Sequence, residues 1–194
     1  MKNLNKKNLF VLIACLIFSL GYGSVQTHNL LQNKGDDKNK KVSIDTVECL
    51  EITGQFDCGV KDFTGFYNVK LIRDNTVVAT QTLSMKNGFS FTLAKDIYYT
   101  IKIEKQGYIP RIFSISTKVD DKLDERNTYV YSFETSLLRE DLGGLFEDDN
   151  IDFPFALISY NKNCDCFEHS KEYTASLIQR MIHNIIYGVY KVKP

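Results

Sequence analysis

The chain has 194 residues, which is enough for one domain with a hydrophobic core and smaller appendages. Its 24 basic and 24 acidic residues balance, so no basic excess indicates a nucleic-acid partner. The chain has no tryptophan, which argues against a broad aromatic platform for sugars.

The first 23 residues have the three-part pattern of a secretory signal peptide. Lys2, Lys6 and Lys7 give a positive start, an apolar run of 12 residues follows from 9 to 20, and small residues follow that run. The run is short for a membrane span, which needs roughly 20 apolar residues. Cleavage after Gly23 would remove three lysines and no acid, and would leave the mature chain with a net charge of −3.

Two other interpretations of this start stay open. The sequence from Leu12 to Cys15 is similar to a bacterial lipobox, in which Cys15 would carry a lipid, although apolar residues follow it. Alternatively, the apolar run remains as an uncleaved anchor. We therefore expect membrane contact only through the signal segment or a lipid anchor.

Residues 24–41 are polar and lysine-rich, and they bury too little apolar surface to fold, so they indicate a flexible tether. From residue 42 to residue 138, short segments alternate apolar and polar side chains, which predicts strands with one buried face. Turn residues separate these segments, and Asn87-Gly88 predicts a hairpin. About seven such strands predict an antiparallel β-sandwich in a mainly β protein.

The order of these strands resembles carboxypeptidase regulatory-like domains, which are transthyretin-like (prealbumin-like) sandwiches. The resemblance rests on four segments and is most specific in the last; they are 52–56, 68–71, 88–93 and 99–108. It implies an accessory module of exported proteins in Gram-negative envelopes, without catalytic residues of its own. The chain departs from the family pattern in the segment 59–66, which is longer and more polar than the usual short loop.

Residues 139–194 predict an acidic loop, an edge strand and a C-terminal helix. Residues 153–160 form the predicted edge strand, and Ser170 is placed to cap a helix. Apolar residues from Tyr173 to Val189 recur at helical spacing, which predicts one apolar face. This face either docks on the sandwich or binds a partner or a membrane surface, and the mixed opposite face disfavours the membrane.

Four cysteines remain after signal removal, namely Cys49, Cys58, Cys164 and Cys166, and an even count in an exported chain permits disulfides. A two-residue hairpin at Thr53-Gly54 would bring Cys49 opposite Cys58. One continuous strand, which the family resemblance implies, would instead hold them roughly 30 Å apart, too far to bridge. We favour the continuous strand, with which Cys49 or Cys58 is free or reaches the tail. For Cys164 and Cys166, a disulfide that involves this pair and inert thiols both stay open.

The same tail segment offers candidates for metal binding, which we consider weaker. Cys164, Cys166 and His169 could hold a soft metal, but a structural zinc site normally needs four ligands. The acidic run 147–152 lacks the glycine and glutamate of an EF-hand loop. We expect no metal and no cofactor.

No motif for catalysis is evident, because the sequence has no Gly-x-Ser-x-Gly elbow and no phosphate-binding glycine loop. Exposed tyrosines are the remaining candidates for a ligand or partner surface, namely Tyr67, Tyr98, Tyr129 and Tyr131. Ordinary packing between cross-strand aromatic residues is the interpretation that we prefer for them.

The sequence therefore predicts an exported, non-catalytic protein of the periplasm or outer membrane that acts as a binding or assembly module. Its expected partner is another envelope protein or a glycan. The alternative is a carbohydrate-binding accessory domain, and a small hydrolase or metalloprotein is a weaker third hypothesis.

Overall fold

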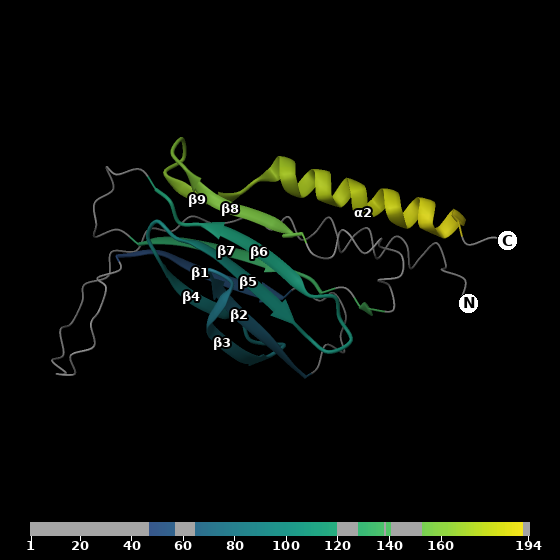
Figure 1. The fold of residues 1–194 in the computed structure, drawn as a ribbon, viewed down its shortest axis with the longest axis horizontal. Coiled ribbons are helices and arrows are strands. Elements are labelled where there is room, and N and C mark those ends of the chain that lie inside the picture. Colours follow the sequence, from purple (N-terminus) through teal and green to yellow (C-terminus); the bar gives the residue numbers. More distant parts are fainter. Residues whose placement is uncertain (1–46, 57–64, 120–127, 138, 141–152, 192–194) are drawn as a thin grey trace.

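Two β-sheets pack face to face, and one helix follows them at the C-terminal end of the chain (Figure 1). The computed structural model describes residues 47–56, 65–119, 128–137, 139–140 and 153–191. The smaller sheet has the order β4 (Phe89–Ala94), β1 (Glu48–Phe56), β7 (Tyr129–Thr135). The predicted mainly β sandwich with a C-terminal helix is confirmed.

The larger sheet has six strands, and one of its neighbouring strand pairs is parallel. Its order is β3 (Thr76–Ser84), β2 (Phe66–Arg73), β5 (Tyr98–Glu104), β6 (Arg111–Ser116), β8 (Ala156–Asn161), β9 (Cys166–His169). Most neighbouring strands are antiparallel, but β7 runs parallel to β1, and β8 runs parallel to β6. Parallel neighbours need long connections, and residues far apart in sequence therefore lie side by side at both places.

Period-two burial builds the core between the sheets, as the sequence predicts. In β4, Phe89, Phe91 and Leu93 are buried while Ser90 and Thr92 are exposed. Strands β2, β5 and β6 alternate in the same way. Each sheet can bury only one face against the other, so the alternation fixes which side chains make the core.

Local turn chemistry predicts some connections correctly. Asp74 and Asn75 join β2 to β3 with φ values of 49° and 60°, and Gly107 lies between β5 and β6 with φ 77°. Asparagine, aspartate and glycine tolerate this left-handed region better than other residues. Both connections are hairpins between antiparallel neighbours.

The hairpin predicted at Asn87-Gly88 is wrong. Strand β3 before it belongs to the larger sheet, and β4 after it belongs to the smaller sheet, so the chain crosses between layers there. The amide of Asn87 still donates to the carbonyl of Ser84 at 2.9 Å, as in a tight turn. The turn is present, but it changes the sheet instead of reversing the strand within one.

The predicted edge position of residues 153–160 is also wrong. Strand β8 lies between β6 and β9, so it is an interior strand. It pairs Phe113 with Ala156 and Ser116 with Ser159 in parallel register. The short strand β9 forms the edge instead, and the C-terminal segment therefore extends the sandwich.

The first strand is continuous, which decides between the two models for its cysteines. Strand β1 runs from Glu48 to Phe56 with Gly54 inside it, so the hairpin model at Thr53-Gly54 is wrong. A Cβ atom at Gly54 would lie 2.3 Å from the ring of Phe89 and 3.2 Å from that of Phe133. Only glycine leaves room for both rings at this position.

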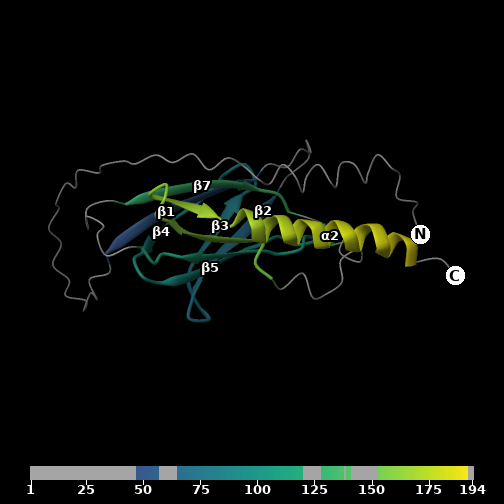
Figure 2. The same ribbon diagram turned by 90° about the horizontal axis from the view of Figure 1, so that it is seen from above.

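Helix α2 (Lys171–Lys191) begins at the predicted cap, because the amide of Tyr173 donates to the Ser170 hydroxyl at 3.3 Å. Leu177 and Ile178 are buried, so the first turns pack against the larger sheet near β8. Figures 1 and 2 show that the far half of the helix runs beyond the sheets. Docking of the apolar face is thus confirmed for its N-terminal part.

Several predicted features lie outside the described residues. They are the signal segment with Cys15, the tether, Cys58, most of the long segment 59–66 and the acidic run 147–152. Their predictions stay as stated above.

We predict that Gly54→Ala destabilises the protein by about 1–3 kcal/mol, because the methyl group would overlap the Phe89 ring. Urea unfolding followed by circular dichroism measures this change. Adding Phe89→Leu should recover part of the loss, since the two sites are in contact. The exposed Gln55→Ala on the same strand should stay within about 0.5 kcal/mol, and an equal loss there would contradict the steric explanation.

Candidate functional site

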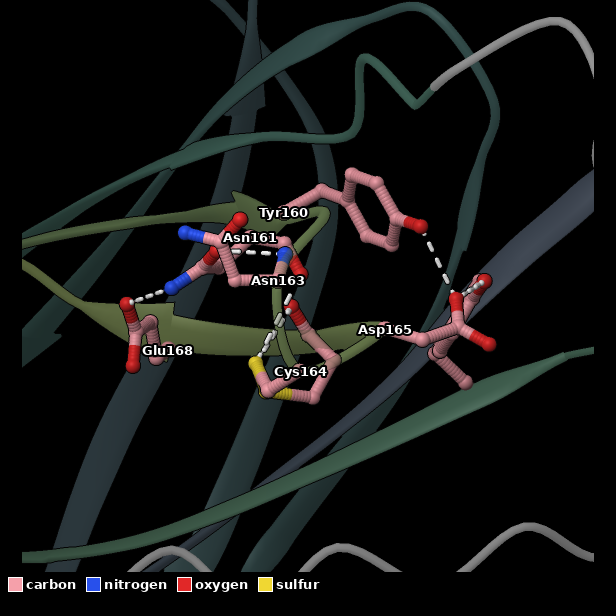
Figure 3. The surroundings of a disulfide bond; sticks show 8 residues. Tyr160, Asn161, Asn163, Cys164, Asp165 and Glu168 are labelled. Atoms are coloured by element: carbon pink, nitrogen blue, oxygen red, sulfur yellow. Dashed lines mark hydrogen bonds between the residues drawn. A yellow bond between two sulfur atoms is a disulfide. The ribbon is translucent and has the colours of Figure 1, made fainter.

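A disulfide closes the tip of the β8–β9 hairpin (Figure 3). It joins Cys164 to Cys166, with Cα atoms 5.2 Å apart, so the structure shows the disulfide and not the alternative of inert thiols. Asp165 between them has φ 52°, a left-handed conformation that aspartate tolerates in tight turns. Cys164 is exposed at the tip, whereas Cys166 is buried.

The carboxylate of Asp165 anchors this tip to the neighbouring sheet. Its Oδ1 accepts a hydrogen bond from the hydroxyl of Tyr129 on β7 at 2.6 Å and another from Tyr160 on β8 at 2.8 Å. These bonds favour the charged carboxylate, and they lower the pKa of Asp165, with Tyr129 the larger cause. Burial raises the pKa of Tyr129, and its interactions with Asp165 and Tyr160 raise it further.

Further contacts hold the hairpin independently of the sulfur bond. The side chain of Asn161 donates to Glu168 at 2.5 Å and accepts from the Asn163 amide at 2.9 Å. The ring of Phe167 packs edge-on against Tyr129 and Tyr160, with ring centroids 5.4 and 5.9 Å apart. The tip is therefore fixed by strand pairing, aromatic packing and two side-chain networks.

The disulfide itself stabilises the fold only slightly. It spans a sequence separation of 2, which is a very small loop. In the chain-entropy model, a loop of three residues contributes about 1.6 kcal/mol, against about 3 kcal/mol for a 15-residue loop. A structural cross-link would be expected to join distant segments, and this one joins neighbours that the hairpin already holds together.

The predicted soft-metal candidate is arranged differently from the expectation. The ligand atoms of Cys164, Cys166 and Glu168 lie within 4.8 Å of one another, so Glu168 takes the place expected for His169. The imidazole Nδ1 of His169 instead lies 3.2 Å from the hydroxyl of Tyr131. With the two sulfur atoms bonded to each other, neither can act as a thiolate ligand.

Cys49 is a free, buried thiol. Its side chain is 2 % exposed, and burial raises its pKa to about 11. The sulfur lies 3.8 Å from the carbonyl oxygen of Thr117. A disulfide of Cys49 is therefore contradicted by the structure.

Three of the four tyrosines proposed as a ligand surface are buried, which corrects that hypothesis. Tyr67, Tyr129 and Tyr131 are 1, 5 and 6 % exposed, whereas Tyr98 is 69 % exposed. The hydroxyl of Tyr67 donates to the Asn87 carbonyl at 2.6 Å, and burial raises its pKa to about 12. Packing between and within the sheets explains these three residues, so no coplanar platform forms.

Arg111 is a polar residue that the sequence analysis missed. It is 6 % exposed, its Nε donates to the Ser136 carbonyl at 2.9 Å, and its guanidinium lies 4.1 Å from the ring centroid of Phe155. Burial lowers its pKa to about 10. In the sequence, its place directly after Pro110 at the start of an alternating segment is the one feature that indicates a position at the start of a strand.

A small cavity lies between β7, β8 and the first turns of α2. Its volume is about 20 Å³, room for about one water molecule. The cavity is lined by His169 and by Thr174, whose buried hydroxyl has no hydrogen-bond partner among the described residues. A cavity of this size accommodates water and not an organic ligand.

The opposite edge of the larger sheet carries a long uncharged strand. Strand β3 spans nine residues without charge or proline, and Val77 and Val78 are 49 and 48 % exposed. It pairs with β2 on one side and is terminal in the sheet on the other. Within the part of the chain that the structure describes, no strand pairs with its outer row of backbone donors and acceptors, which suits that row to another strand.

Among the described residues, no helix is both long and apolar enough to cross a membrane.

Comparison with known proteins gives no family. No family model matches the chain, and no curated protein matches it. Among solved structures, one titled "Crystal Structure of S.CueP" is similar with a TM-score of 0.30 and 10 % identity over 46 % of this chain and 62 % of that one. A 3-chlorocatechol 1,2-dioxygenase from Rhodococcus opacus 1CP is similar with a TM-score of 0.33 and 8 % identity over 68 and 77 % of the two chains. Neither similarity supports an inference about function.

We predict that Asp165→Asn destabilises the hairpin in a pH-dependent manner. Because the folded protein lowers the pKa of Asp165, its contribution is full above the unfolded pKa of about 3.9. The contribution is lost as the pH falls through the lower, folded pKa. Urea unfolding from pH 7 to pH 2 should therefore show a difference between the wild type and the variant that is constant above about pH 5 and shrinks below about pH 3.9.

The control removes the two donors. In a Tyr129→Phe, Tyr160→Phe background, Asp165→Asn should have little effect at any pH, because the carboxylate has lost both hydroxyl partners. A difference that persists in this background would show that the tyrosine hydroxyls do not cause the pKa shift.

Proposed function

We propose that this chain is an exported protein of the cell envelope whose β-sandwich serves as a non-catalytic assembly module. The signal-like start of the sequence supports export. The Cys164–Cys166 disulfide supports it independently, since such bonds persist in oxidising compartments. Membership of the carboxypeptidase regulatory-like group belongs to this proposal, with the strand order as its support.

The uncharged edge strand β3 is the observation that carries the assembly function. Exposed edges in soluble proteins are commonly protected by charges, prolines or bulges. Strand β3 has neither charge nor proline. Its one irregularity is a bulge at Val78, and the segment from Ala79 to Ser84 keeps regular pairing with β2. Most of the edge is therefore suited to strand addition.

The partner that fits this edge is the same strand of a second copy. Antiparallel pairing about a twofold axis at Thr80 would place Thr80 opposite its own copy and Ala79 opposite Gln81. No like charges meet in this arrangement, because the strand has none. The outer backbone groups of both copies would gain hydrogen-bond partners, and the two larger sheets would form one continuous sheet.

The carbohydrate-binding alternative has lost its support, because Tyr67, Tyr129 and Tyr131 lie in the core. Single exposed rings such as Tyr98 are common on soluble proteins and need no ligand.

We predict that charge at position 80 controls self-association. Thr80→Glu and Thr80→Lys should each sediment as monomers at concentrations where the wild type is dimeric, because like charges would face each other across the axis. An equimolar mixture of the two variants should regain the dimer, since opposite charges then meet. Analytical ultracentrifugation over a wide concentration range measures all three samples.

The matched control is Ser159→Lys, which places a charge at an exposed position of the interior strand β8, opposite Glu168 of β9. This variant should associate like the wild type. A wild type that stays monomeric at every concentration, or variants at Thr80 that associate as it does, would contradict assembly through β3.

A further inference from the structure

The disulfide at the hairpin tip is accessible from one side. Cys164 is exposed, while Cys166 is 7 % exposed and is held in strand β9 opposite Asn161. Figure 3 shows Cys164 at the turn, with Asp165 directed away toward Tyr160. A thiolate that approaches from solvent can therefore reach the Cys164 sulfur more easily than the Cys166 sulfur.

The hairpin does not depend on this bond for its shape. The ladder from Ile158 to Asn161, the two tyrosine hydroxyls on Asp165 and the Asn161–Glu168 hydrogen bond all remain when the sulfur atoms separate. The Asn161 carbonyl oxygen lies 3.5 Å from the Cys164 sulfur, so a Cys164 thiol would have a ready acceptor. Opening the bond therefore leaves a nearly unchanged dithiol.

We infer that the Cys164–Cys166 disulfide is a thiol–disulfide exchange site that accepts two electrons from a dithiol. A thiolate of the dithiol attacks the Cys164 sulfur, the sulfur–sulfur bond breaks, and Cys166 leaves with the electron pair and takes a proton from water. The second thiol of the partner then loses its proton and attacks the partner's first sulfur, which is bonded to Cys164 in the mixed disulfide. Cys164 leaves and is protonated, so the hairpin ends as two thiols and the partner as a disulfide.

The charges near the tip indicate which dithiol fits. The carboxylate of Glu168 lies within 4.8 Å of both sulfur atoms, and Asp165 separates the two cysteines. Lys162 and His169 are the basic residues of the hairpin, and His169 is directed toward Tyr131 on β7. An approaching thiolate on a cationic molecule should therefore react faster than one on an anionic molecule. The expected partner is a protein dithiol in a basic surface.

The first test is equilibrium with glutathione under native conditions. Mature protein carrying Cys58→Ser is incubated in buffers of reduced and oxidised glutathione, trapped with iodoacetamide and analysed by mass spectrometry. The Cys164–Cys166 bond should pass reversibly from oxidised to reduced across these buffers, with an unchanged circular dichroism spectrum. Cys49 is the internal control and should stay unlabelled, because it is buried.

Two variants that each keep one cysteine of the pair, both carrying Cys58→Ser, test the direction of attack. With oxidised glutathione, Cys166→Ser, which keeps the exposed Cys164, should form a mixed disulfide at least tenfold faster than Cys164→Ser, which keeps the buried Cys166. A wild-type circular dichroism spectrum for each variant shows that it folds. Because both variants lack the disulfide, a difference in their rates does not come from its loss. Equal rates would overturn the assigned order of attack.

Thiols of opposite charge test the expected partner. At equal thiolate concentration and low salt, cysteamine should reduce the bond several-fold faster than 2-mercaptoethanesulfonate, and salt or Glu168→Gln should narrow the difference. A bond that stays oxidised in every glutathione buffer until urea unfolds the protein, or a reduced protein that loses its sheet spectrum, would show a structural cross-link and overturn the inference. Neither result bears on assembly through β3, which lies at the opposite edge of the sheet.

Discussion

Gly54 has no side chain, and the rings of Phe89 and Phe133 occupy the space over it. The Phe133 ring in turn lies 4.6 Å from that of Phe113, centroid to centroid, and Phe113 lies 6.1 Å from Phe155. This row of rings crosses from the smaller sheet to the larger one and reaches the residue before β8. The packing of the sheets, and the placement of the C-terminal strands on them, thus depends on one position in β1 where only glycine fits.

The two edges of the larger sheet are connected to the smaller sheet by different contacts. On one side, the tyrosines of β7 reach the β8–β9 hairpin, where Tyr129 bonds to Asp165 and Tyr131 approaches His169. On the other side, Gln81 of β3 donates to the Ser90 carbonyl of β4 at 2.6 Å. The larger sheet therefore ends in a short strand tied to its neighbours at one edge and in a long uncharged strand at the other.

Much of the fold could be predicted because burial between two sheets imposes a strict period of two. Phe89, Phe91 and Leu93 show that period clearly, and the strand they predict is present. The sequence predicts the turn at Asn87-Gly88 correctly, but the predicted hairpin is wrong. Local turn chemistry does not tell whether the next strand joins the same sheet. That choice depends on contacts with β1, far away in sequence.

The burial of the tyrosines was harder to predict for a related reason. Tyr67 shares its parity with Val69 and Leu71, and this pattern indicated a buried face. In β7, by contrast, Val130 alternates with Tyr129 and Tyr131, so both faces have apolar residues and the phase is ambiguous. The partner that buries Tyr129 is the hairpin whose Asp165 lies 36 residues later in the chain, and sequence periodicity cannot identify it.

The separation of the two proposed sites has a physical consequence for how they could act together. Exchange at the tip changes one bond in a small loop that contributes little to stability, and its surroundings are fixed by Asp165 and Phe167. The three strands β2, β5 and β6 lie between that hairpin and β3, and their ladders do not involve either cysteine. Reduction of the disulfide should therefore leave the β3 edge in place, so that an assembled protein can still exchange electrons at its exposed tips.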